Sequence, residues 1–235
     1  LHVQLKESIL TAIARGDYEA HTQLPSQRAL CKQFNMSHMT VRRAINELVQ
    51  EDIIYAIPGK GIFVSPPSPV VESDSLQGFA AQLARFGMAP TTSILDAEIM
   101  PASALMGQTL KLPANTPLVY LRRLRLADGR PHAINSSYLP HHLCPGLLEK
   151  FRLSNSLFET LRSDYGLKLA GSVTVVSSAL ADEKAARLLQ LTRPAPLLVR
   201  EQITYLDGGE PIEFSSTLTH GASNHLQFQE GIVPE

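Results

Sequence analysis

The sequence has no tryptophan and only two cysteines, Cys31 and Cys144, among its 235 residues. Two thiols are too few for the disulfide framework on which small secreted domains depend, so we expect both to be reduced. No apolar run approaches the roughly 20 residues of a membrane-spanning helix, and no secretory signal is visible. A hydrophobic content of 44% argues against a disordered chain. We therefore expect a cytoplasmic, globular protein of one large or two ordinary domains.

The chain also lacks an excess of positive charge, with 21 Lys and Arg against 22 Asp and Glu. Residues 1–64 hold seven of the basic and six of the acidic residues, which gives net charges of +1 there and −2 in the remainder. This balance of charges excludes a strongly basic protein that binds any nucleic acid without sequence preference. It suits a site-specific, dimeric DNA binder whose affinity depends only modestly on salt.

Residues 24–64 are the most informative part of the chain. Ser26 is a suitable N-cap for a short helix that should end at Asn35. Ser37 should cap a second helix, and residues 1–15 show the spacing of a helix packed across these two. The second helix has an apolar stripe with intervals of three and four, made of Val41, Ala44, Ile45 and Leu48.

A β-hairpin is expected after these helices, because apolar stretches at 53–55 and 62–64 flank the tip Pro58-Gly59-Lys60-Gly61. Glycine lets the tip approach DNA closely, and Lys60 supplies charge. Side chains near the start of a recognition helix read base edges, whereas Arg28 is better placed for phosphate. The alternative is a solvated turn beside a solvated charged face. The predicted DNA-binding residues are Arg28, Ser37, His38, Thr40, Arg42, Arg43, Gly59, Lys60 and Gly61.

The order of these motifs resembles the winged helix-turn-helix domain of GntR-type bacterial transcription regulators. The resemblance covers about 64 residues and rests on Leu24-Pro25-Ser26-Gln27-Arg28, on Ser37-His38-Met39-Thr40-Val41-Arg42 and on Gly59-Lys60-Gly61-Ile62-Phe63-Val64. It implies that Arg28, the start of the second helix and the wing glycines contact DNA. Many relatives have Arg or Pro at the position of His38, so the base preference there is left open.

The pattern changes after residue 64. Residues 65–75 contain three prolines and no amphipathic period, so they should form a linker between a domain of residues 1–64 and one of residues 76–235. The second domain should be α+β with a mostly antiparallel sheet. Its expected strands are 91–100, 118–126, 131–139, 172–180, 197–205 and 211–219. Its expected helices are one from about 79 to Gly87, then 103–110, about 143–150, 155–164 and 182–189.

Several motifs of this second domain resemble the UTRA effector domain of the HutC branch of GntR regulators, whose fold is similar to that of chorismate lyase. The resemblance spans about 160 residues, and it implies a pocket for a small anionic metabolite. In relatives that sense sugar phosphates, arginines at the positions of Arg123 and Arg125 hold the anion. The motifs are residues 121–131, Asn135-Ser136-Ser137-Tyr138-Leu139-Pro140, Ser156-Leu157-Phe158, Tyr165-Gly166 and residues 204–215.

Arg123 and Arg125 alternate onto one strand face, where two guanidinium groups can clamp an anion. Alternatively, one of them pairs with Glu201 or Glu213 in a structural bridge. Glu213 itself either accepts hydrogen bonds from the effector or is a surface carboxylate. The predicted effector-binding residues are Phe79, Arg123, Arg125, Asn135, Ser137, Ser156 and Glu213.

Two of these residues bear on the kind of effector. Ser156 should cap a helix and can also donate to a phosphate. The family often has Glu where this chain has Asn135, so a charged amine on the effector is less expected. A sugar phosphate, a phosphonate and a carboxylate remain open.

An enzyme is not expected, because no nucleophile elbow, phosphate loop or metalloprotease motif occurs. We therefore predict no catalytic residues and no cofactor. His141-His142 with Cys144 has no paired ligand motif, so no metal site is predicted either.

Taken together, these features predict a bacterial one-component transcription regulator, most simply a repressor. It should bind a palindromic operator as a homodimer and be released or repositioned by a small anionic metabolite. Two alternatives remain: a chorismate-lyase-like enzyme that also binds DNA, and an effector-blind DNA-binding module.

Overall fold

The computed structural model spans residues 1–235 and describes all of them except 52, 58, 66–69, 73–78, 85–86, 155, 222–224 and 228–235. The chain divides into two compact units, residues 1–68 and 69–235. Each unit has its own apolar core. Within the described residues, no helix is both long and apolar enough to cross a membrane.

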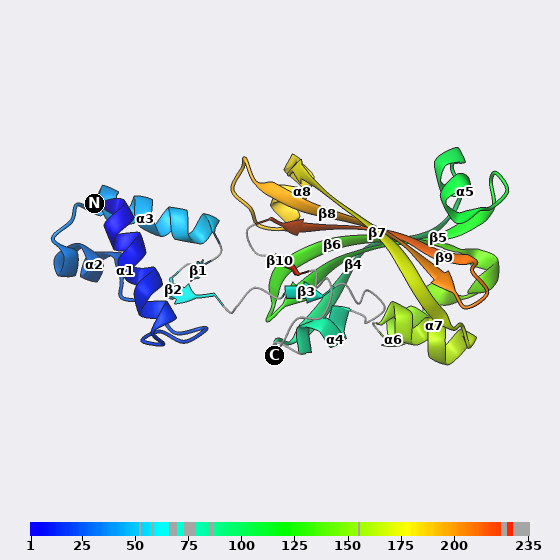
Figure 1. Cartoon of the computed structure of the whole chain (residues 1–235), viewed down its shortest axis with the longest axis horizontal. Coiled ribbons are helices and arrows are strands. Elements are labelled where there is room, and N and C mark those ends of the chain that lie inside the picture. Colours follow the sequence, from blue (N-terminus) through cyan, green and yellow to red (C-terminus); the bar gives the residue numbers. More distant parts are fainter. Residues whose placement is uncertain are drawn as a thin grey trace, which may run out of the picture. The chain divides into compact units, whose positions relative to one another are not determined.

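The first unit is a winged helix-turn-helix, as the sequence predicts (Figure 1). Its expected caps are present, because Ser26 Oγ accepts from the Ala29 N–H and Asn35 ends the helix in the left-handed conformation. Buried Leu5 and Ile9 pack with the apolar stripe of the third helix. The elements are α1 (His2–Ala14), α2 (Gln27–Phe34), α3 (His38–Gln50) and the antiparallel pair β1 (Ile54–Ile57) and β2 (Gly61–Val64).

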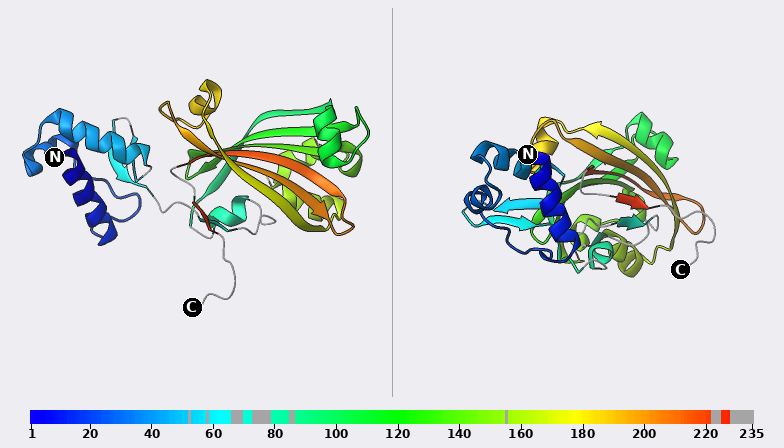
Figure 2. Two further views of the ribbon diagram at one scale, coloured as in Figure 1. Left: turned by 45° about the horizontal axis from the view of Figure 1, so that its top comes forward. Right: turned by 60° about the vertical axis from the view of Figure 1, so that its left-hand side comes forward.

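The second unit is built on a twisted six-stranded antiparallel sheet with the strand order β4-β5-β6-β9-β8-β7 (Figure 2). A separate parallel pair joins β3 (Val70–Glu72) to β10 (His225–Gln227). The strands of the large sheet are β4 (Pro90–Pro101), β5 (Pro117–Ala127), β6 (Arg130–Pro140), β7 (Leu169–Leu180), β8 (Pro196–Leu206) and β9 (Pro211–His220).

Helices lie on both faces of this sheet (Figure 1). One face packs against α6 (Leu147–Ser154) and α7 (Leu157–Tyr165) through a core that includes Leu121 and Phe151. The short α4 (Phe79–Ala84) contacts β4. The opposite face carries α5 (Ala104–Leu110) and α8 (Glu183–Leu188).

The predicted fold class is confirmed, and the six strands agree with their expected ranges to within three residues. The helix expected near 143–150 is wrong in its bounds, since α6 begins and ends four residues later. A 3₁₀ turn (His141–Leu143) precedes α6, because Pro145 and the left-handed Gly146 (φ +72°) interrupt the chain between them. Part of the predicted linker lies outside the described residues, and β3 falls within its range.

Candidate DNA-binding surface and effector pocket

The first turn of α3 exposes several polar side chains. Ser37 Oγ accepts from the Thr40 N–H at 3.2 Å and lies 2.9 Å from Thr40 Oγ1, so this serine starts the helix. His38 and Arg42 are exposed, whereas Arg43 donates to Glu47 Oε1 at 3.0 Å along the same helix. An accessible helix start of this kind is what major-groove reading requires. Arg28 is exposed on α2.

The tip of the wing is held by a residue that the sequence did not indicate. Gln23 Nε2 donates to the Lys60 carbonyl at 2.8 Å. The backbone of Gly61 has φ +127°, which favours glycine, and a side chain there would place its Cβ 2.4 Å from that nitrogen, so Gln23 would have to move. Gly59 is also left-handed (φ +75°), and Lys60 is exposed between the two glycines. Pro58 lies outside the described residues.

Most of the predicted effector-binding residues converge on the sheet face that α6 covers. Arg123 on β5 is in register with Asn135 on β6, and Leu121 is in register with Ser137. Ser137 is in turn in register with Ser215 on β9, two residues after Glu213. Because side chains alternate along a strand, these polar groups share one face, which we call the arginine face.

Arg123 is buried, with 2% of its surface exposed. Its Nη2 donates to Ser137 Oγ at 2.7 Å and also to Asn135 Oδ1. Its Nε and Nη1 have no hydrogen-bond partner within the described part of the chain. The Cζ atom lies 5.5 Å from the centre of the Phe151 ring. Burial, and secondly repulsion by Arg125, hold the Arg123 pKa well below its ordinary value. The site therefore offers unused N–H donors in a region of low polarity.

Arg125 joins this group from the next outward position of the same face. Its Nη1 donates to Thr92 Oγ1 at 2.9 Å, and its Cζ atom lies 5.1 Å from the centre of the Phe79 ring. Burial lowers the Arg125 pKa to about 10, and the charge of Glu213 opposes that shift. The group is therefore still a cation at neutral pH. Phe79 stacks on this cation, which is its role in the arrangement.

Glu213 is buried with 2% of its surface exposed, so the surface-carboxylate alternative is wrong. Thr204 Oγ1 donates to Glu213 Oε2 at 3.4 Å. Burial raises the pKa of Glu213, while a hydrogen bond with Ser137 and the charges of the two arginines oppose the rise. No ion pair among the described residues joins either arginine to Glu213. Glu201 is exposed and in register with Ser216 on the other face, so the proposed bridge to it is also wrong.

Of the two roles predicted for Ser156, that of a helix cap is wrong. Ser156 stands at the N-cap position of α7, but its side chain makes no capping hydrogen bond. Its φ and ψ of −120° and 109° differ from the −66° and 152° of Ser37, whose hydroxyl does cap. Instead, the Ser156 carbonyl accepts from Thr160 Oγ1 at 2.8 Å.

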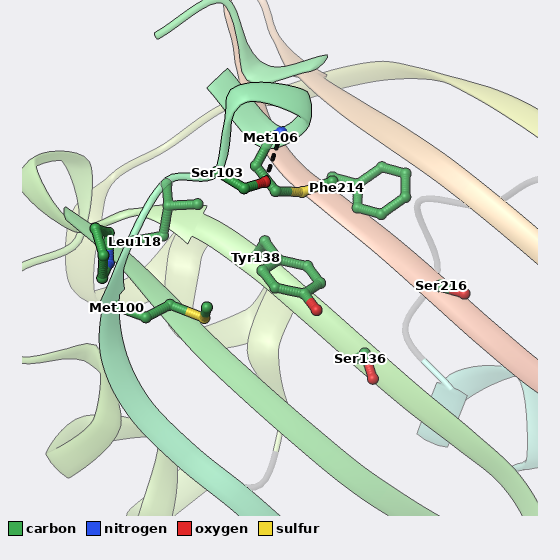
Figure 3. Close-up of a pocket in the computed structure, with 9 residues that line it drawn as sticks. Met100, Ser103, Met106, Leu118, Ser136, Tyr138, Phe214 and Ser216 are labelled. Atoms are coloured by element: carbon green, nitrogen blue, oxygen red, sulfur yellow. Dashed lines mark hydrogen bonds between the residues drawn. The ribbon is translucent and has the colours of Figure 1, made fainter. Parts of the chain in front are cut away.

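A hollow of about 350 Å³ lies beside α5 (Figure 3). Because Ser136 and Tyr138 alternate with Asn135 and Ser137 along β6, the hollow is on the sheet face opposite the arginines. Tyr138 stands in its wall, 4.9 Å from the Tyr120 ring and 6.1 Å from the Phe214 ring. Ser136 and Ser216 line it from β6 and β9. The sheet itself separates this mainly apolar hollow from the arginine face.

The His141-His142 and Cys144 stretch does not gather into a metal site in the described residues, where no suitable cluster of three ligands occurs. Both cysteines are free, and burial raises the pKa of the Cys144 thiol to about 12. A protonated, buried thiol is unreactive.

Two family models match the chain. Residues 1–64 match the bacterial regulatory proteins of the gntR family, and residues 85–223 match the UTRA domain. Among solved structures, PhnF from Mycobacterium smegmatis is 21% identical, with a TM-score of 0.67 over 94% of this chain and 96% of that one. YydK from Bacillus subtilis is 22% identical, with a TM-score of 0.61 over 98% and 99% of the two chains. These likenesses support the fold.

Two repressors are similar to this chain over most of its length. The transcriptional repressor NagR of Bacillus subtilis is 27% identical over 94% of this chain and 90% of its own length. The mannosyl-D-glycerate system repressor MngR of Escherichia coli is 26% identical over 92% and 89%. These relatives are regulators and not enzymes, as the sequence predicted for this chain. The chain therefore belongs to the GntR family of bacterial transcription regulators, in the branch of repressors that carry a UTRA effector domain.

Proposed function

We propose that this chain is a cytoplasmic, dimeric repressor that binds a palindromic operator and is released by a small anionic metabolite. The effector enters the arginine face and is held by Arg123 and Arg125. Phe79 supports Arg125, and Asn135 and Ser137 support Arg123. Glu213 accepts from hydroxyl groups of the effector, and Ser156 lies beside its anion at the start of α7.

The observation that carries this proposal is the buried guanidinium of Arg123. Two of its three nitrogens lack partners in the part of the chain that the structure describes, and a second arginine lies beside it. Two neighbouring buried cations have more positive charge than Glu213 can balance, and a bound anion supplies the missing charge and acceptors. The relative MngR is the repressor of a mannosyl-D-glycerate system, which supports a metabolite as the signal.

The direct test is a thermal-shift screen of sugar phosphates, phosphonates and carboxylates with the wild type and Arg123→Gln. Ligands that bind the native state raise its midpoint of unfolding. We expect one class to stabilise only the wild type and to weaken its operator binding in an anisotropy titration. If no anion shifts the wild type, the effector proposal is wrong.

The DNA contacts proposed here are Arg28 to phosphate, the start of α3 to base edges, and the wing tip to the adjacent groove. Exposure of His38, Arg42 and Lys60 supports this assignment. Arg43 forms an ion pair with Glu47, so it should contribute less to DNA affinity than Arg42 does. The test is operator affinity for single Ala variants: Arg42→Ala should change sequence preference, and Arg28→Ala should weaken all sequences equally.

A second copy of the chain is proposed to cover β7 and the sheet face opposite the arginines. β7 is a long edge strand with exposed apolar side chains: Val173 is 57% exposed and Val175 59% exposed, and both lie on that face. Uncovered edge strands of this kind invite aggregation, so a partner is expected there. Two-fold pairing would also match a palindromic operator.

Sedimentation of point variants tests this pairing. Val175→Asp adds a charge to the proposed interface and should shift the protein to monomers. Thr174→Asp adds the same charge at the neighbouring exposed position on the other face and should leave the dimer intact. A dimer that survives both substitutions would place the interface elsewhere.

A further inference from the structure

A third arginine lies at the far end of the arginine face. Four central strands align one residue each in a single row: Arg123 on β5, Asn135 on β6, Thr217 on β9 and Arg200 on β8. Since residues in register share a face, an arginine stands at each end of this row, with an amide and a hydroxyl between them. Sequence reasoning did not single out Arg200 or Thr217.

The charges along this row do not balance within the described residues. Glu213 is the carboxylate that acts on Arg123, Arg125 and Arg200 alike. Burial lowers the Arg200 pKa, so this group too is withdrawn from water. One carboxylate facing three guanidinium groups leaves an excess of positive charge, which is costly in a buried site.

This excess of positive charge lies at the two ends of the row, at Arg123 and at Arg200. Arg123 leans over β6, because its Nη2 bonds to side chains of that strand. The backbones of β5 and β8 are separated by three strand spacings, or ~14 Å. Within the described part of the chain, the Arg200 side chain has no hydrogen bond or ion pair with another side chain. Its guanidinium group is therefore available to a ligand at the end of the row away from Arg125.

The side chains between the two arginines are polar or small. Asn135 Nδ2 donates to Thr217 Oγ1 at 2.8 Å, so the threonine hydroxyl keeps its own hydrogen for a ligand. Ala133 lies beside Asn135 on the same face and leaves room above the strand. A chain or ring with hydroxyl groups fits such a floor better than an apolar one.

We infer, on the basis of the function proposed above, that Arg200 forms a second anion-binding position. The effector then carries two negatively charged groups, one at each end of a short hydroxylated segment. Phosphorylated sugar acids and hydroxylated phosphonocarboxylates have this chemistry. A ligand with one anion would occupy the Arg123 end alone.

Calorimetric titration of the full chain with matched pairs of probes tests this inference. The pairs share a carbon skeleton and a phosphate and differ in a carboxylate: glycerol 3-phosphate with 3-phosphoglycerate, erythritol 4-phosphate with 4-phosphoerythronate, and glucose 6-phosphate with 6-phosphogluconate. In at least one pair the doubly anionic member should bind the wild type about tenfold more tightly. Arg200→Gln should reduce that preference below about twofold and retain binding of the singly anionic member.

Three further variants keep the result interpretable. Arg200→Lys preserves the charge and should keep most of the preference. Arg187→Gln removes an exposed arginine of α8 and should change nothing. Arg123→Gln should abolish binding of both members. If the wild type binds both members of every pair equally, or if Arg200→Gln weakens both equally, Arg200 is no second position, although the effector proposal stands. If no probe binds the wild type, the second position is wrong, and the effector proposal is decided by the screen of sugar phosphates, phosphonates and carboxylates described above.

Discussion

The side-chain amide of Asn135 connects β9 to the buried Arg123. Its Nδ2 donates to Thr217 Oγ1 at 2.8 Å, and its Oδ1 accepts from Arg123 Nη2. The amide therefore holds the guanidinium in place without neutralising it. This leaves the charge of Arg123 available to a ligand, which a carboxylate at the same position would not do.

A charge at residue 135 should compete with the effector. In Asn135→Asp, the new carboxylate pairs with Arg123, so anion affinity should fall about tenfold or more while the unliganded protein becomes no less stable. Calorimetric titration with the best anion of the screen measures this. Ser136→Asp places the same charge one residue away on the opposite face and should alter affinity less than about twofold. Equal losses in both variants would contradict a local competition.

Removal of the Arg123 charge should abolish anion binding without lowering the stability of the unliganded protein. Arg123→Met discards a buried cation with unused donors, and Ser137 Oγ still donates to Asn135 Oδ1 at 3.2 Å. We expect the free energy of unfolding of the unliganded protein to stay equal or to rise by about 1 kcal/mol. Stabilisation by anions should vanish. Urea unfolding with and without ligand tests both points, and a loss of stability beyond about 2 kcal/mol would show that the guanidinium is structural.

The two wing glycines should respond differently to alanine. A methyl group on Gly59 (φ +75°) would meet no atom within 4 Å, so Gly59→Ala should cost only the left-handed strain of about 1 kcal/mol. Gly61→Ala also displaces Gln23 from the Lys60 carbonyl and should cost about 2–3 kcal/mol. Urea unfolding of the full chain compares the two variants with the wild type. Equal costs would mean that Gln23 does not hold the wing.

Two matched helix caps distinguish stability from recognition. Ser26 and Ser37 each accept from a backbone N–H at 3.2 Å, so either Ser→Ala change should cost about 1 kcal/mol. Ser37 also contacts Thr40 at the start of α3, so only Ser37→Ala should weaken operator binding measurably beyond the loss of folded protein. Anisotropy titrations at a temperature where both variants are folded provide the comparison. A similar loss for Ser26→Ala would overturn the special role of Ser37.

Effector affinity should depend on pH through Glu213. Burial raises the pKa of this carboxyl above 4.5, and a bound anion repels its ionised form. The protonated pocket therefore binds an anion more tightly. Affinity should decline as pH rises from the raised pKa of Glu213 in the free pocket to its still higher pKa in the complex, and it should level off above that.

Glu213→Gln removes this dependence, because the amide cannot ionise. The ratio of wild-type to variant affinity, measured between about pH 5 and pH 8, cancels the ionisation of the ligand itself. The ratio should fall with pH. A ratio that stays constant across the range would show that Glu213 does not change its protonation there.

Much of the fold followed from local signals in the sequence. Caps such as Ser26 and Ser37 and the left-handed Asn35 act through their nearest neighbours, so their residue types were sufficient. The alternation of Arg123 and Arg125 also predicted their shared face correctly. Burial of Glu213 was not predictable, because it depends on which strand lies beside β9 and on the packing of α6 and α7.

The residues that were missed depend on contacts between distant segments. Gln23 holds the wing across 37 residues of sequence, and Arg200 enters the row only because β8 pairs with β9. Neither position stands out in composition or spacing. Ser156 shows the converse: its residue type suits a cap, but its side chain makes no capping hydrogen bond.

The two central strands of the sheet serve both of its faces. Along β6, Asn135 and Ser137 belong to the arginine face, and Ser136 between them lines the hollow on the other side. The same backbone segment of β6 therefore lines the proposed effector site on one face and the hollow on the other. A change of strand twist around a ligand would be felt at once on the far side, so no relay of side chains is needed between the pocket and the surface proposed for the partner.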